Sequence, residues 1–245
     1  MDNVKPFFGY SDNTHLCNFL WNLGIPSYYG GAVMTQFAMQ GKMDDITVQS
    51  LKHALFESGD REIAISEKYT EEDLDWSVKE NLIKVRKRES NDGLIWNGTE
   101  DVEGILWGGC VESPMVQMSS TKYLPSDTDL ENTFLFIETA EDIPDHWIIE
   151  YLLTGFGERG WLNKFKGILV GRPKTWAFDK PFNAEKKADY RKTQRETVIR
   201  VVREYNQYIP IVQNLDFGHT DPQVVVSMGN KAKIYSSEKR IFFHY

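Results

Sequence analysis

Residues 133–138 read TFLFIE, four apolar residues in succession that lead into a carboxylate. An unbroken apolar run of this kind, rich in aromatic and β-branched side chains, is typical of a strand buried on both faces. A second apolar run at residues 165–171 ends on a glycine, and the stretch 148–156 between the two runs predicts a helix that Gly157 closes. Strand, helix and strand in this order predict an α/β fold with a parallel sheet.

Similar patterns extend from this unit in both directions. Apolar residues at helical spacing predict helices at 15–23, 45–56 and 193–205. In the first of these helices, one face carries Leu16, Phe19, Leu20 and Leu23. Further strands are predicted at residues 6–12, 25–31, 102–107 and 209–215 and near Val224 and Ile234. Residues 64–90 show no sustained period, which is typical of a linker or an excursion between domains.

Composition limits the classes of function. The chain has 245 residues, with 28 Lys and Arg against 36 Asp and Glu and a formal net charge of −8. Because this charge repels a phosphate backbone, we expect no nucleic-acid partner. Two cysteines, Cys17 and Cys110, lack the number and spacing of a disulfide framework or a zinc site, so we expect no metal. The absence of a long apolar stretch and of a signal-peptide pattern predicts a cytoplasmic protein without membrane contact, provided that Met1 is the true start.

Two residues have the chemistry that triad hydrolysis requires. Glu138 follows the apolar run directly, so its carboxylate lies at the edge of a buried core. His219 follows the predicted strand 209–215 in a turn where Gly218 gives the backbone freedom to present a side chain. A histidine base oriented by a carboxylate is the arrangement that activates a nucleophile. Position alone leaves open a structural role for His219 and a surface or helix-capping role for Glu138.

Five short segments in order resemble the successive motifs of the LD-carboxypeptidase family of serine peptidases. They are GYSDNT (9–14), GILWGG (104–109), LFIE (135–138), GILVG (167–171) and GHTDP (218–222). The resemblance implies a Ser-Glu-His triad without a cofactor, in which Glu138 and His219 are the catalytic acid and base. The two residues are 81 positions apart (219 − 138), and an insertion at residues 174–192 would explain the spacing. Glu141 and Asp142 are the other candidates for the acid.

The nucleophile of the family is expected on a strand-to-helix elbow upstream of the GYSD segment. On this reading Ser11 is a structural residue near the elbow, the nucleophilic serine is missing from an N-terminally truncated chain, and the chain alone has little or no turnover. Cys17 is expected in the core, and Cys110, which a loop after two glycines could expose, is not expected to replace the serine. The predicted domains are a remnant of an N-terminal α/β domain (1–75), a linker (76–97) and a β-rich C-terminal α/β domain (98–245).

The resemblance includes two branches, muramoyl-tetrapeptide carboxypeptidases and proteins similar to the microcin C self-immunity peptidase. The segments 69–76 and 93–98 resemble the longer, Trp-bearing connection of the second branch, which favours that branch, and an indole in this connection can stack on a nucleobase. Trp96 is therefore a candidate substrate-binding residue, with packing between domains as the alternative. We expect a small peptide or peptidyl-nucleotide substrate and a homodimer. A catalytically inactive member that acts as a binding or dimerisation module is the other hypothesis.

Overall fold

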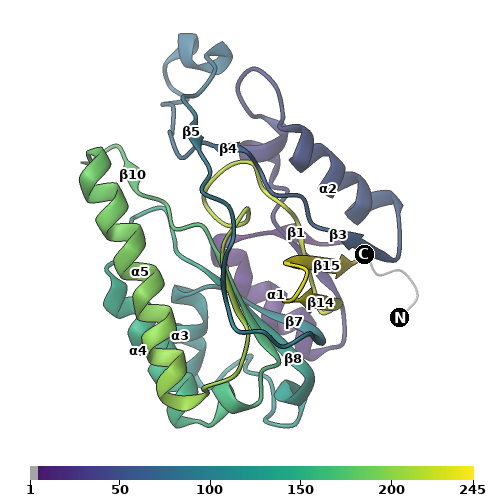
Figure 1. The fold of residues 1–245 in the computed structure, drawn as a ribbon. Helices are drawn as coiled ribbons and strands as arrows, with labels where there is room; N and C mark the ends of the chain where they lie inside the picture. Colours follow the sequence, from purple (N-terminus) through teal and green to yellow (C-terminus); the bar gives the residue numbers. More distant parts are fainter. Residues whose placement is uncertain (1–4) are drawn as a thin grey trace.

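A mixed sheet of eight strands forms the centre of the structure, a computed structural model that describes residues 5–245 (Figure 1). The start at Met1 lies outside the described residues. In spatial order the strands are β3 (Asp60–Glu62), β15 (Arg240–His244), β14 (Lys231–Tyr235), β7 (Val102–Cys110), β8 (Thr133–Glu138), β9 (Gly167–Gly171), β12 (Ile211–Leu215) and β6 (Ile95–Asn97). Strands β7, β8, β9 and β12 are parallel, and the others pair antiparallel at the two flanks. The predicted α/β fold is confirmed.

A smaller sheet holds the N-terminal strands. Its order is β1 (Phe8–Gly9), β2 (Ser27–Tyr29) and β13 (Val226–Met228), with β1 and β2 parallel and β13 antiparallel to β2. The helix α1 (Thr14–Asn22) connects the first two strands. Short two-stranded pairs join β4 (Lys68–Tyr69) to β5 (Glu89–Ser90) and β10 (Trp176–Ala177) to β11 (Lys180–Pro181).

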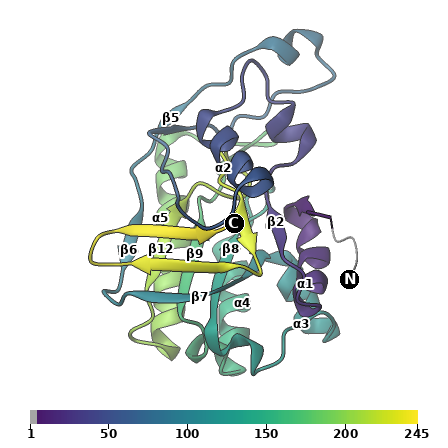
Figure 2. The same ribbon diagram turned by 90° about the vertical axis from the view of Figure 1, so that its right-hand side faces the viewer.

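Helices cover the large sheet and complete the layers. Figures 1 and 2 show α4 (His146–Glu158) beside α5 (Ala184–Tyr205), on the side of the molecule opposite to α2 (Asp45–Phe56). The helix α3 (Glu112–Ser120) follows β7 and was not predicted, because its sequence has little helical periodicity. Among the described residues, no helix combines the length and apolar character needed to cross a membrane. The core beneath the helices is aromatic, with Trp107 stacked on Phe165 at 6.1 Å between ring centroids.

The helix α5 begins at Ala184, nine residues before the predicted start at Thr193 (193 − 184), so the prediction of its length was wrong. The first half of the helix is polar, so the pattern of apolar residues did not reveal it. That half is held by charge: Lys187 Nζ lies 2.5 Å from Glu71 and Arg191 lies 3.1 Å from the same carboxylate. Asn183 caps the helix by accepting a hydrogen bond from the Lys186 N–H at 2.9 Å.

These ion pairs also fix the segment 66–91, in which the sequence shows no period. Glu71 is buried and accepts the N–H of Thr175 at 2.7 Å as well. Asp216 accepts from the N–H of Ser66 at 2.7 Å and from Arg172 at 2.6 Å, both deep in the structure. The segment is therefore anchored by buried polar groups instead of an apolar face.

The helix α1 departs from the prediction in another way. Its apolar face is largely exposed, with Leu16 and Phe19 each 41% accessible, and Leu23, which follows the helix, is 48% accessible. The residues it buries are Thr14, Cys17 and Asn18. The expectation that Cys17 lies in the core is confirmed, whereas the amphipathic pattern did not identify the packed side of the helix.

Candidate active site

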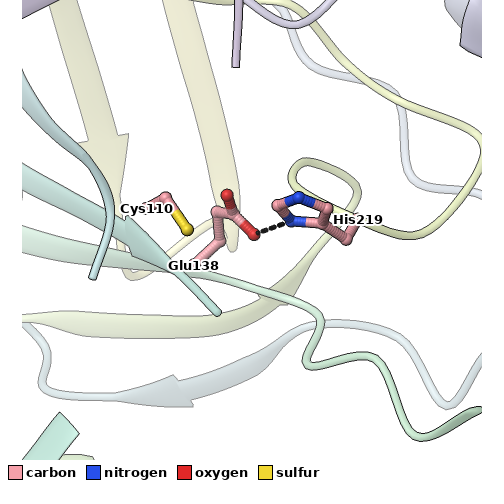
Figure 3. Close-up of side chains that lie close together, drawn as sticks. All are labelled: Cys110, Glu138 and His219. Atoms are coloured by element: carbon pink, nitrogen blue, oxygen red, sulfur yellow. Dashed lines mark hydrogen bonds and ion pairs between the residues drawn. The ribbon is translucent and has the colours of Figure 1, made fainter. Parts of the chain in front are cut away.

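The topology brings Glu138 and His219 together. Glu138 is the last residue of β8, and His219 lies in the loop after β12, so both are at the carboxyl edge of the parallel strands. His219 Nδ1 donates to Glu138 Oε2 at 2.8 Å, and the side chains are 6% and 1% exposed (Figure 3). The approach depends on Gly218, which has φ +98° and whose Cβ, if present, would lie 2.6 Å from Glu138 Oε2. The pair has the geometry that a histidine base and its orienting carboxylate adopt in hydrolytic triads.

Tyr29 holds the other oxygen of Glu138. Its hydroxyl donates to Glu138 Oε1 at 2.5 Å and accepts the backbone N–H of Ser11 at 3.0 Å. Burial, followed by the charge of Glu138, raises the pKa of Tyr29 well above its ordinary value, so the phenol keeps its proton and donates. Both carboxylate oxygens of Glu138 are therefore fixed, and the same phenol ties Glu138 to the Ser11 backbone.

Ser11 lies where a short strand turns into a helix. It follows β1, opens the 3₁₀ turn η1 (Ser11–Asn13) that precedes α1, and has φ +58°. A non-glycine residue in the left-handed region is strained, and such strain is typical of active-site turns. The ring of Tyr10, the preceding residue, packs 4.9 Å from the ring of His219. Ser11 and His219 thus lie on the same side of the site.

Both residues line a pocket of about 720 Å³. Other walls come from residues between 34 and 40, from the segment 71–76, which the buried ion pairs of Glu71 hold in place, and from residues after β9. Lys174 and Arg86 also line it, but Lys174 lies 2.5 Å from Asp73 and Arg86 lies 2.8 Å from Asp221. Lys174 and Arg86 are therefore already paired with carboxylates.

The second nitrogen of the imidazole is also occupied. His219 Nε2 lies 3.0 Å from Glu141 Oε2, on the loop that follows β8. Burial lowers the pKa of His219, but the charge of Glu138 and the hydrogen bonds to Glu138 and Glu141 outweigh it and raise the pKa to about 10. The hydrogen bond to His219 lowers the pKa of Glu141 to about 2. In this state the imidazole is a cation between two carboxylates.

Cys110 lies on the far side of Glu138 from the histidine (Figure 3). It ends β7 and is 3% exposed, so the loop exposure considered from the sequence is wrong. Burial and the neighbouring carboxylates Glu138 and Glu112 raise its thiol pKa, which disfavours a thiolate. One donor atom each of Cys110, Glu138 and His219 lies within 4.8 Å of the others. The thiol donates to Glu112 at 2.9 Å and Glu138 is fully hydrogen-bonded, so a metal would have to break these bonds.

The structure does not bring Trp96 to this site. Trp96 belongs to the edge strand β6, where it pairs with Val212 of β12 and packs, partly buried, against the core. It is not among the residues that line the pocket. The tryptophan that lines the pocket is Trp76, which is 50% exposed, and Phe178, 64% exposed, lines it as well. Sequence reasoning also missed Tyr29, because a tyrosine in a short strand carries no signal of a catalytic partner.

The sequence of this chain is similar to those of known proteins. A family model described as the LD-carboxypeptidase C-terminal domain matches residues 103–234, more than half of the chain. The microcin C7 self-immunity protein MccF of Escherichia coli is 26% identical over 98% of this chain. A putative carboxypeptidase of Treponema pallidum is 27% identical over 98% of it. The chain spans 65% and 64% of the lengths of these two relatives.

Among solved structures, an MccF-like protein from Streptococcus pneumoniae in complex with AMP superposes with a TM-score of 0.82 at 25% identity. The match covers 99% of this chain and 70% of that chain. The family resemblance drawn from the five motifs is thus confirmed by sequence and by fold. The chain belongs to the LD-carboxypeptidase family.

Proposed function

We propose that the chain is a serine hydrolase of the carboxypeptidase type, with His219 as base and Glu138 as the residue that orients it. The observation that carries the proposal is the buried 2.8 Å contact between Glu138 Oε2 and His219 Nδ1, next to a pocket that His219 lines. A carboxylate on Nδ1 leaves Nε2 as the nitrogen that faces a nucleophile.

Ser11 is our candidate for the nucleophile, in place of the upstream serine expected from the sequence. It lies on a strand-to-helix turn with φ +58° and lines the same pocket as His219. A serine on a strained turn between a strand and a helix, two residues after a glycine, is the geometry of a nucleophile elbow. The Tyr29 hydroxyl that bonds both Glu138 and the Ser11 N–H supports the assignment, since it links the turn to the acid.

The reaction then follows ordinary acyl transfer. The Ser11 hydroxyl attacks the substrate carbonyl while Nε2 of His219 takes its proton, and the imidazolium returns that proton to the leaving nitrogen. Water, activated by the same imidazole, hydrolyses the acyl-serine and regenerates the site. The backbone N–H of Asp12, the residue after Ser11, is the candidate donor to the oxyanion.

For the substrate we propose an aminoacyl- or peptidyl-nucleotide amide, with a cell-wall tetrapeptide as the alternative. The relative MccF is named for immunity to microcin C7, and the Streptococcus pneumoniae structure holds AMP. Exposed Trp76 and Phe178 in the pocket supply aromatic faces for a planar base. The role predicted for Trp96 stays a prediction.

Hydrolysis assays test the proposal. The 245-residue chain is incubated with an aminoacyl sulfamoyl adenylate and with a tetrapeptide ending in D-alanine, beside Ser11→Ala and His219→Gln. Turnover by the wild-type chain that both variants lose supports the proposed triad. Turnover that survives Ser11→Ala shows that Ser11 is not the nucleophile. Ligand binding without turnover in the folded wild-type chain favours the non-catalytic binding module.

The homodimer also stays a prediction for this chain. The exposed Leu16 and Phe19 of α1, with Leu23 directly after the helix, offer an apolar surface of the kind that self-association buries. Light scattering coupled to size exclusion measures the assembly directly. A monomer at micromolar concentration contradicts this expectation.

A further inference from the structure

Glu141 occupies the position that the proposed mechanism assigns to the serine hydroxyl. Its Oε2 lies 3.0 Å from His219 Nε2, whereas Nδ1 is bonded to Glu138. A carboxylate has no proton to donate at neutral pH, so the Nε2 that bonds to it carries the hydrogen. An imidazole that donates from both nitrogens has no lone pair with which to accept a proton from Ser11.

The two carboxylates that hold the ring differ in freedom. The Glu138 side chain is 1% exposed and is fixed by Tyr29 on one oxygen and His219 on the other. The Glu141 side chain is 61% exposed, and its carboxylate bonds to His219 and to its own backbone N–H. A carboxylate that is this exposed to solvent can move without leaving a buried charge unpaired.

We infer that Glu141 is a displaceable positioning residue, which holds His219 by Nε2 in the free protein and leaves when substrate brings Ser11 and the imidazole together. The inference rests on the proposed serine mechanism. Lys174, which is paired with Asp73, is our candidate receiver for the displaced carboxylate, because both residues line the pocket and the charge of Lys174 already acts on Glu141. Loss of the Glu141 contact lowers the pKa of His219, so the Nε2 proton passes to solvent water and leaves a neutral imidazole whose lone pair faces Ser11.

The charged surroundings of His219 support this order of events. The titratable groups around it are Glu138 from β8, Glu141 from the following loop, the phenol of Tyr10 and, beyond Glu138, the thiol of Cys110. Asp221 on the same loop as His219 is paired with Arg86 at 2.8 Å. Both hydrogen-bonded carboxylates raise the pKa of His219, to about 10, and only Glu141 can be withdrawn without breaking the buried pair.

Two variants separate the charge of Glu141 from its contact. Glu141→Gln removes the charge and keeps the shape, and Glu141→Ala removes both. Asp142→Asn is the matched control: it removes a charge from the next residue of the same loop, whose carbonyl accepts from Lys180. The imidazole of His219 is titrated by NMR in each protein, with His219→Gln to assign the signal. The inference expects both Glu141 variants to lower the His219 pKa by about one to three pH units, and Asp142→Asn to leave it near the wild-type value.

Kinetics supply a second readout that a merely structural residue would not move. Because kcat/KM reports the free protein, its acid limb should move to lower pH in Glu141→Gln by the same amount as the titration. At neutral pH kcat/KM should rise about tenfold for each pH unit by which the His219 pKa falls, while kcat changes less than about threefold, since bound substrate has already displaced Glu141. An unchanged His219 titration in both Glu141 variants overturns the inference, as does a raised KM with an unmoved pH limb, which would make Glu141 a substrate-binding residue.

The NMR titration of His219 also distinguishes failure of this inference from failure of the proposed function. A lowered His219 pKa in a chain that hydrolyses neither substrate supports the hold on Nε2 and counts against the hydrolase. Hydrolysis with an unchanged His219 pKa supports the hydrolase and shows that Glu141 does not control the protonation of His219.

Discussion

The hydroxyl of Tyr29 donates to Glu138 at 2.5 Å and accepts the N–H of Ser11 at 3.0 Å, so one phenol joins the proposed acid to the proposed nucleophile turn. The side chain is 1% exposed. A buried group with two such bonds fixes the relative position of both partners.

Replacing Tyr29 by Phe removes this link. Glu138 Oε1 loses its donor in a buried site, which we expect to lower the free energy of unfolding by about 1–3 kcal/mol. Misplacement of the triad should reduce kcat by about 10- to 100-fold. The control is Tyr28→Phe, a half-buried neighbour on the same strand whose ring stacks on Phe8. Equal effects of the two substitutions on kcat would contradict the positioning role of Tyr29.

Substitutions of Ser11 should separate activity from stability. Ser11→Ala and Ser11→Gly both remove the nucleophile and should lower kcat by about 10⁴-fold or more. Because Ser11 has φ +58°, glycine relieves strain that alanine keeps, so Ser11→Gly should be more stable than Ser11→Ala by about 1 kcal/mol. Denaturant unfolding measures the difference. If the two variants unfold at the same denaturant concentration, the turn is not strained.

The proton on His219 couples stability to pH. Folding raises the pKa of His219 from 6.5 to about 10, so between these values the native state binds a proton that the unfolded chain has lost. This contribution is fully present below pH 6.5 and is lost as pH rises through about 10, with a slope of at most about 1.4 kcal/mol per pH unit. The difference in unfolding free energy between wild type and His219→Gln, measured from pH 6 to 10, should therefore shrink as pH rises. A difference that grows with pH would mean that His219 is buried as the neutral ring.

Gly218→Ala tests the close approach of the histidine loop to β8. Its Cβ would lie 2.6 Å from Glu138 Oε2 on a backbone with φ +98°. We expect a loss of about 2–4 kcal/mol in unfolding free energy, with loss of activity. Gly160→Ala is the control, since Gly160 has φ +76° and no atom within 4 Å of an added Cβ, so it reports the backbone cost of about 1 kcal/mol alone. Similar losses in both variants would show that the contact with Glu138 adds nothing.

We expect replacement of Trp76 and replacement of Trp96 to affect nucleotide binding differently. Trp76→Ala should weaken AMP binding by about 1–3 kcal/mol if the indole stacks on the base. Trp96→Ala should change AMP affinity little, because Trp96 belongs to β6 at the edge of the large sheet and packs against the core. Calorimetric titration of AMP into each folded variant measures both. The reverse result would restore the role predicted for Trp96 from the sequence.

The sequence predicted those parts of the molecule in which apolar pattern and motif agree. The α/β class, the helix at 45–56 and the strand that ends at Glu138 all follow from apolar periodicity, and the structure has α2 at Asp45–Phe56. The proximity of Glu138 and His219 followed from the motifs, since parallel strands present their carboxyl ends at one edge. No periodicity could place them 2.8 Å apart.

The parts that were missed depend on polar contacts between distant segments. The first half of α5 is stabilised by Glu71, more than a hundred residues away, so its own sequence shows no reason to be helical. The contacts of Tyr29 and Glu141 with the proposed triad are likewise set by tertiary structure. The strained conformation of Ser11 is a backbone property, which a motif that names only the residue types does not reveal.

The proposed triad joins three elements that the chain makes far apart: Ser11 precedes Glu138 by 127 positions (138 − 11), and Glu138 precedes His219 by 81 (219 − 138). Contacts of such separation close late in folding, because the entropy of long loops opposes them. The loop after β12 must therefore leave the ribosome before the proposed triad can form. The rate at which hydrolysis recovers after dilution from denaturant would then report the last long-range step of folding. Chains that end before the loop after β12 would not hydrolyse substrate.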